Sequence, residues 1–125
     1  MAGVTLDAGA LIALERAERR ALVLLARARE TGARLTLPAT VLAQVLRRPE
    51  GQVPLMRLSR QPGTDVVPLD RAGAAAVGRL LASANAVDIV DAHVVVCARR
   101  TGQPVLTSDP EDLRRLDPGL ELVVL

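Results

Sequence analysis

Short apolar runs with β propensity alternate along this chain with longer segments whose apolar positions recur at helical spacing. The predicted strands cover residues 4–6, 34–37, 65–68, 105–107 and 120–125. The predicted helices cover residues 10–17, 19–31, 39–48, 53–60, 71–83, 88–100 and 111–116, with Gly and Pro punctuating their ends. Because strands and helices alternate, we predict a single domain over residues 1–125. Its fold is a three-layer α/β/α arrangement with a central parallel sheet covered by helices on both faces.

One segment, residues 88–97, fits either a strand or a helix. Ile89, Val90 and the run Val94-Val95-Val96 have β propensity, and an apolar run cannot distinguish a buried strand from a buried helix by periodicity alone. The length of the segment and the alanines within it favour a central helix.

Three carboxylates lie at the edges of predicted core segments. Asp7 closes the first strand, Asp109 follows the strand at residues 105–107, and Asp91 lies in the almost wholly apolar segment at residues 88–97. A carboxylate beside a core is unfavourable unless it is paired, hydrogen-bonded or bound to metal. Open parallel sheets bind ligands beyond the carboxyl ends of their strands, where Asp7 and Asp109 are expected. The pattern therefore predicts an acidic site that holds Mg²⁺ or Mn²⁺.

Helix capping is the alternative explanation of these acids. Asp109 precedes a proline and would be an N-cap, with Asp112 in the first helical turn. Asp88 and Asp91 match an N-cap followed three residues later by an acid. Capping explains Asp7 poorly, because Asp7 ends a strand and is followed by Ala-Gly-Ala. A structural domain whose acids only cap helices is therefore an alternative hypothesis to a metal site.

The composition narrows the function classes. Half of the 125 residues are hydrophobic, none is Phe, Trp or Tyr, and all 16 basic residues are Arg, for a net charge of +2. Without aromatic rings the chain cannot stack nucleobases as single-strand binding platforms do. The charge permits phosphate contacts without demanding them. No basic region followed by a long apolar stretch opens the chain, and no run is long enough to span a bilayer, so we expect a soluble, cytoplasmic protein without membrane association.

The single histidine and single cysteine give no zinc or nucleophile motif. His93 lies two residues from Asp91, on a different helical face, and is interpreted as a packed residue rather than a general base. Cys97 is interpreted as a small core residue, and a lone cysteine forms no internal disulfide.

Three motifs resemble those of the PIN domain family. Residues 4–14 (VTLDAGALIAL) resemble its opening motif, residues 91–98 (DAHVVVCA) its central acidic helix, and residues 105–113 (VLTSDPEDL) its closing strand, turn and helix. Their order and the length of the chain are similar to those of VapC-type toxins.

This resemblance implies a parallel-sheet α/β/α fold and a metal-dependent endoribonuclease, in which Asp7, Asp91 and Asp109 hold Mg²⁺ or Mn²⁺. Asp112 is a further candidate at the closing position, and Asp88 would support Asp91 from one helical turn away. The resemblance also implies an RNA substrate, a homodimer and an antitoxin partner that blocks the acidic pocket.

The sequence departs from the family pattern at two positions. The place that usually holds Glu in the helix after the second strand holds Gln44, which carries no charge and cannot act as a base. The hydroxyl residue that usually follows the first acid is replaced by Ala8. A catalytically weak or inactive PIN module that binds RNA or a protein is therefore the alternative function. Arg99 and Arg100 are the predicted contacts to the RNA backbone.

Overall fold

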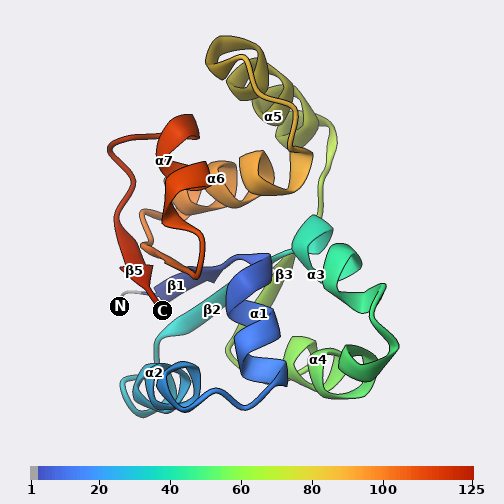
Figure 1. Ribbon diagram of the computed structural model, residues 1–125, viewed down its shortest axis with the longest axis vertical. Helices are drawn as coiled ribbons and strands as arrows, with labels where there is room; N and C mark the ends of the chain where they lie inside the picture. Colours follow the sequence, from blue (N-terminus) through green and yellow to red (C-terminus); the bar gives the residue numbers. More distant parts are fainter. Residues whose placement is uncertain (1–2) are drawn as a thin grey trace.

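The computed structural model describes residues 3–125 and contains a five-stranded, all-parallel sheet in the order β3-β2-β1-β4-β5 (Figure 1). The strands are β1 (Gly3–Leu6), β2 (Arg34–Pro38), β3 (Thr64–Val67), β4 (Val105–Thr107) and β5 (Leu122–Val124). The helices are α1 (Ala8–Glu15), α2 (Arg19–Glu30), α3 (Ala39–Leu46), the 3₁₀ turn η1 (Pro49–Gly51), α4 (Gln52–Ser59), α5 (Arg71–Ala84), α6 (Ile89–Thr101) and α7 (Pro110–Leu116). Every predicted strand and helix is present, with ends that differ by at most two residues.

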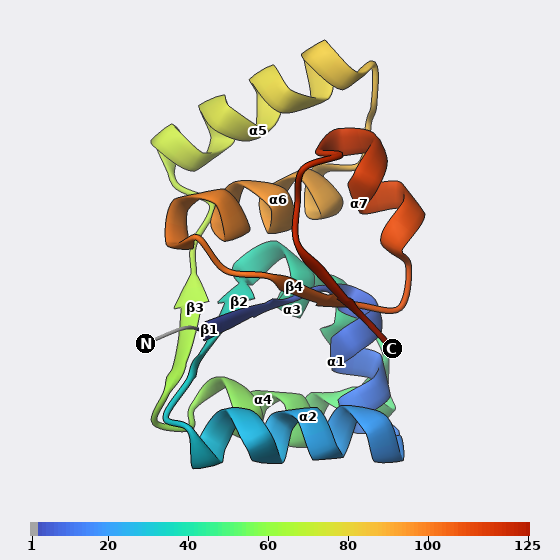
Figure 2. The same cartoon turned by 90° about the vertical axis from the view of Figure 1, so that its left-hand side faces the viewer.

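Figure 2 shows helices on both faces of the sheet, which confirms the predicted three-layer α/β/α fold. α6 and α7 lie on one side, with α5 stacked outside α6, and α1, α2 and α4 lie on the other. α3 contacts both α1 and α6.

The core is densest around α6 and the central strands. Residues 92–98 of α6 are all buried, and β4 is buried along its whole length. A segment buried on all sides can be apolar all round, which explains why residues 88–97 showed no clear helical period. The helical interpretation of this segment is confirmed. At the end of α6, Gly102 adopts a left-handed conformation (φ 67°), which ends the helix without the strain that a side chain would bring there.

The strand order places a topological switch point between β1 and β4. The chain leaves β1 toward β2 on one side of the sheet and leaves β4 toward β5 on the other. In sheets of this kind, the crevice that receives ligands opens beyond the carboxyl ends of the two strands at the switch. Leu6 pairs with Leu106, so the residues that follow β1 and β4 emerge side by side.

Among residues 3–125, no single helix is both long and apolar enough to cross a membrane. The consecutive helices α5 and α6 reach that length and hydropathy only when taken together, and they are bent by 111° to each other.

Candidate active site

Asp7 is held rigidly at the end of β1, and it is the buried acid of the site, with 5% of its surface exposed. Its Oδ1 accepts a 2.8 Å hydrogen bond from the Ala10 N–H, so Asp7 is the N-cap of α1. The expectation that capping explains Asp7 poorly was wrong. α1 begins at Ala8, two residues earlier than predicted, because β1 passes into the helix without an intervening loop. The carboxylate of Asp7 also accepts hydrogen bonds from the Thr107 side chain and the Gly9 N–H.

Thr107, at the end of β4, links two of the acids. Its fully buried hydroxyl accepts a 2.8 Å hydrogen bond from the Asp109 N–H. Burial raises the pKa of Asp7, while the Thr107 side chain and the N–H groups of Ala10 and Gly9 lower that pKa, so burial prevails. Thr107 was not among the site residues predicted from the sequence. Its position directly before two polar residues at a strand end was the available signal.

Asp109 is exposed, and its carboxylate does not cap α7. Pro110 occupies the first helical position as predicted, but the predicted capping role of the Asp109 side chain was wrong. A hydrogen bond shared with the Asp112 carboxyl raises the pKa of Asp109, with smaller contributions from burial and from the charges of Asp112 and Asp7. Asp109 and Asp112 therefore lie together, and two carboxylates in contact favour a shared proton or a bound cation.

Asp91 lies at the centre of the acidic group, in the first turn of α6. Burial raises its pKa to about 6, and the charges of Asp88, Asp112, Asp7 and Asp109 add to the effect in that order. Asp88 caps α6 as predicted, because its Oδ1 accepts a 3.0 Å hydrogen bond from the Asp91 N–H. The structure thus brings all five predicted acids into one electrostatic neighbourhood.

The donor chemistry of this group suits a hard divalent cation. All the ligands offered are carboxylate oxygens, and a cation would relieve the repulsion and desolvation that raise the pKa values of Asp7, Asp91 and Asp109. Within residues 3–125, no three acidic, histidine or cysteine side chains are close enough together to form a ready coordination set. Binding would therefore require the exposed carboxylates to turn toward Asp7.

The sequence profile of the PIN domain matches residues 4–118, which is nearly the whole chain. The chain belongs to the PIN domain family. This PIN domain is similar to a chain in the crystal structure of VapBC2 from Rickettsia felis, with a TM-score of 0.72. In that crystal VapBC2 is bound to a DNA fragment from its promoter. The two chains share 13% sequence identity, and the match covers 98% of each, so the likeness shows the fold. No curated protein matches the sequence.

Gln44 lies in α3 and is half-buried. It lines a shallow depression together with Thr40, Ala43, Arg47 and Val90, the residue before Asp91. The depression therefore reaches from α3 to the first turn of α6. A neutral amide there adds no charge to the site.

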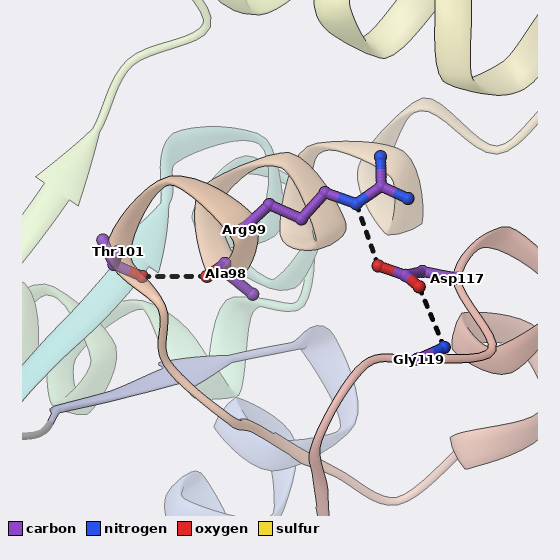
Figure 3. Close-up of polar contacts among 5 residues, drawn as sticks. All are labelled: Ala98, Arg99, Thr101, Asp117 and Gly119. Atoms are coloured by element: carbon purple, nitrogen blue, oxygen red, sulfur yellow. Dashed lines mark hydrogen bonds and ion pairs between the residues drawn. The ribbon is translucent and has the colours of Figure 1, made fainter.

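Arg99 and Arg100 lie at the opposite end of α6 from the acids. Arg99 follows Asp91 by eight residues, which is about 12 Å along a helix. Its Nε donates to Asp117 Oδ2 at 2.9 Å, and Asp117 Oδ1 accepts from the Gly119 N–H at 3.0 Å (Figure 3). Arg99 therefore tethers the loop between α7 and β5 to α6. The structure does not bring these two arginines to the acidic group.

His93 and Cys97 are core residues, as their packing interpretation predicted. His93 is 1% exposed, and its Nδ1 lies 2.7 Å from Thr40 Oγ1. Burial lowers the pKa of His93, so the ring is neutral at pH 7, and burial raises the pKa of Cys97 to about 11. Neither side chain offers a charged catalytic group to the site.

Proposed function

We propose that this PIN domain is a metal-dependent endoribonuclease of the VapC type, in which Asp7, Asp91 and Asp109 hold Mg²⁺ or Mn²⁺. The observation that carries the proposal is the convergence of acids from β1, α6 and the β4–α7 turn at the switch point of the sheet. PIN domains are typically metal-dependent nucleases, which agrees with this arrangement.

The role of each acid in holding the cation would depend on how deeply it is buried. Asp7 would be the fixed ligand, because its cap bond and the Thr107 hydroxyl hold it in one orientation. Asp91 and Asp109 would complete the set, with Asp112 and Asp88 keeping the surroundings negative. A divalent cation bound there would lower the pKa of a coordinated water and neutralise charge on the phosphate. His93 is buried, so it does not activate a water in place of the cation.

The alternative is a PIN module that binds RNA or a protein without cutting, and Gln44 favours it. A missing fourth carboxylate weakens both the attraction for a cation and the supply of a proton acceptor. The absence of a preformed coordination set among residues 3–125 points the same way.

An RNA cleavage assay with Mn²⁺ separates these functions. The variants are Asp7→Asn, which keeps a capping oxygen while removing the charge, and Gln44→Glu, which restores a carboxylate. Cleavage by the wild type that disappears in Asp7→Asn supports the nuclease. No wild-type cleavage, with activity gained in Gln44→Glu, supports the binding module. Asp117→Asn is the matched control, because it makes the same chemical change at an aspartate that pairs with Arg99, away from the acidic group.

Calorimetry tests the remaining possibility, that the acids serve only as helix caps. If Mn²⁺ does not bind, or binds equally well to Asp7→Asn, the result favours this structural account over both functions. Measurable binding that Asp7→Asn abolishes and Asp117→Asn leaves intact supports the metal site independently of cleavage.

We also propose a protein partner and self-association. The similar R. felis structure is that of VapBC2 bound to promoter DNA. By analogy, we propose that an antitoxin binds this chain and covers its acidic group. An arginine supplied by such a partner would compete with the cation for the carboxylates. Light scattering of the purified chain tests the expected homodimer, and a monomer at micromolar concentration would contradict it.

A further inference from the structure

A hollow of about 310 Å³ opens directly beside the acidic group. One wall is the α5–α6 loop, residues 84–88, and the other is formed by Asp112, Arg115 and Leu116 of α7, with Asp91 between them. Its size is at the lower end of the range for small-ligand pockets, enough for about one nucleotide unit. Because Asp91 belongs to the lining, a ligand in this hollow lies against one of the acids.

Arg115 is the basic residue that lines this hollow. Its side chain is 77% exposed, and its Nη1 lies 3.5 Å from Asp112 Oδ1, farther than the 2.7–2.9 Å of a strong charge-assisted bond. Arg99, by contrast, is held at 2.9 Å by Asp117 at the other end of α6. The Arg115 guanidinium is therefore free to turn toward a ligand, and a guanidinium matches the geometry of a phosphate.

The opposite wall is fixed and apolar at its tip. Asn85 ends α5 in a left-handed conformation (φ 50°), and Asp88 caps α6, so the short loop is held at both ends. Val87, between them, is 91% exposed, more than any other large hydrophobic residue among 3–125. The chain contains no Phe, Trp or Tyr, and an aliphatic side chain is what this wall offers to a sugar or base.

We propose that this hollow is the substrate subsite beside the metal-binding acids, and that Arg115 binds a backbone phosphate of the RNA there, with Val87 packing against the neighbouring nucleoside. The inference rests on the proposed function and assigns to it a positioning residue. A phosphate approaching five carboxylates needs a compensating cation on the substrate side, and Arg115 supplies that charge on the path to Asp91.

The test compares Arg115→Gln with Arg114→Gln in cleavage of a short single-stranded RNA with Mn²⁺. Arg114 is the exposed neighbour of Arg115 in α7, and it does not line the hollow. Arg114→Gln therefore removes the same charge from the same helix without changing the hollow. Arg115→Gln is expected to raise KM about tenfold and to leave kcat nearly unchanged. It should also reduce the slope of log KM against log salt by about 0.7, the value for one phosphate contact on a single strand. Arg115→Lys should restore the slope and only part of the affinity.

Three results would overturn the inference. The first is an equal change of KM in Arg115→Gln and Arg114→Gln, which would indicate general surface charge. The second is a loss of kcat at constant KM, and the third is a weaker Mn²⁺ affinity, which would indicate that Arg115 acts by positioning Asp112 rather than by binding a phosphate. Equal unfolding midpoints of the two variants exclude a folding effect.

A binding measurement separates this inference from the proposed function. Fluorescence anisotropy with the same RNA is performed in the Asp7→Asn background, where no cleavage is needed. If the wild type does not cut RNA but Arg115→Gln weakens RNA binding more than Arg114→Gln does, the subsite stands and the nuclease proposal fails. If RNA is cut but neither variant alters binding, or if RNA does not bind at all, the subsite fails.

Discussion

Asp91→Asn is expected to stabilise the metal-free protein at neutral pH, because Asp91 carries a charge that its surroundings disfavour. Burial and four neighbouring carboxylates raise its pKa to about 6. Its own N–H is bonded to Asp88, and this backbone bond is unaffected by the substitution. Asn resembles Asp in helix propensity, so the principal change is the loss of an unfavourable charge.

The magnitude follows from the pKa. A rise from 3.8 to about 6 corresponds to about 3 kcal/mol against the ionised folded state. Asp91 is only half-buried, so solvent screening reduces this to about 2 kcal/mol. Loss of the carboxylate also removes about 0.5 kcal/mol of favourable interaction with the N-terminus of α6. The expected gain in the free energy of unfolding is about 1–2 kcal/mol, or about 3–8 °C in Tm for a chain of this length.

The sign of the pH dependence is defined by the raised pKa. Well below pH 3.8 the carboxyl of Asp91 is protonated in both the folded and the unfolded protein, and its charge has no effect on stability. As the pH rises from about 4 to about 6, the unfolded chain ionises first, so the folded state becomes relatively less stable. The gain from Asp91→Asn should therefore be small at pH 4 and complete at pH 7.5.

Urea unfolding in EDTA at pH 4 and pH 7.5 measures this difference. Asp117→Asn is the control, because it removes a charge from a favourable pair with Arg99 and should cost up to about 1 kcal/mol. Mn²⁺ at about 100 times its Kd should add about 2.7 kcal/mol to the wild type and nothing to Asp91→Asn, which reverses the order of stability of these two proteins. The reasoning is refuted if Asp91→Asn is no more stable than the wild type at pH 7.5, or if its gain is the same at both pH values.

Three further predictions concern the residues that hold the acids in place. Thr107→Val removes the buried hydroxyl that accepts the Asp109 N–H, and should lower the free energy of unfolding by about 1–3 kcal/mol in urea titrations; unchanged stability would contradict its linking role. A Cβ at Gly9 would collide with the Ser108 hydroxyl, so Gly9→Ala should weaken Mn²⁺ binding in calorimetry. Ser108→Ala should restore that binding, and failure of this rescue would count against the collision. Asp7→Ala should be about 1 kcal/mol less stable than Asp7→Asn, since Asn keeps the capping oxygen, and equal thermal midpoints would show that the cap contributes nothing.

Local patterns in the sequence were enough to predict the helices and strands to within two residues. Caps were less predictable. Asp88 caps α6 as expected, but Asp7 caps α1 unexpectedly and Asp109 does not cap α7. Whether a carboxylate caps depends on its rotamer, and the Asp7 side chain is also hydrogen-bonded by Thr107, which comes from another strand.

The positions of the arginines relative to the acids were also not predictable from the sequence. Arg99 and Arg100 follow the acidic segment closely in sequence, yet a helix of 13 residues carries them away from the acids. Arg115 lies 24 positions after Asp91 and lines the same hollow, because α7 packs beside α6. Proximity in sequence is a poor guide to proximity in space once a helix intervenes.

By itself the sequence determined the order of elements, the parallel sheet and the presence of acids at strand ends, because hydrophobic period and turn residues act over a few positions. Only the tertiary structure decided that β1 and β4 are neighbours, and that the charges of Asp7, Asp88, Asp109 and Asp112 all act on Asp91. The physical reason is that charge repulsion, burial and the Thr107 link act through space between segments far apart in the chain. Such interactions exist only after the sheet has assembled.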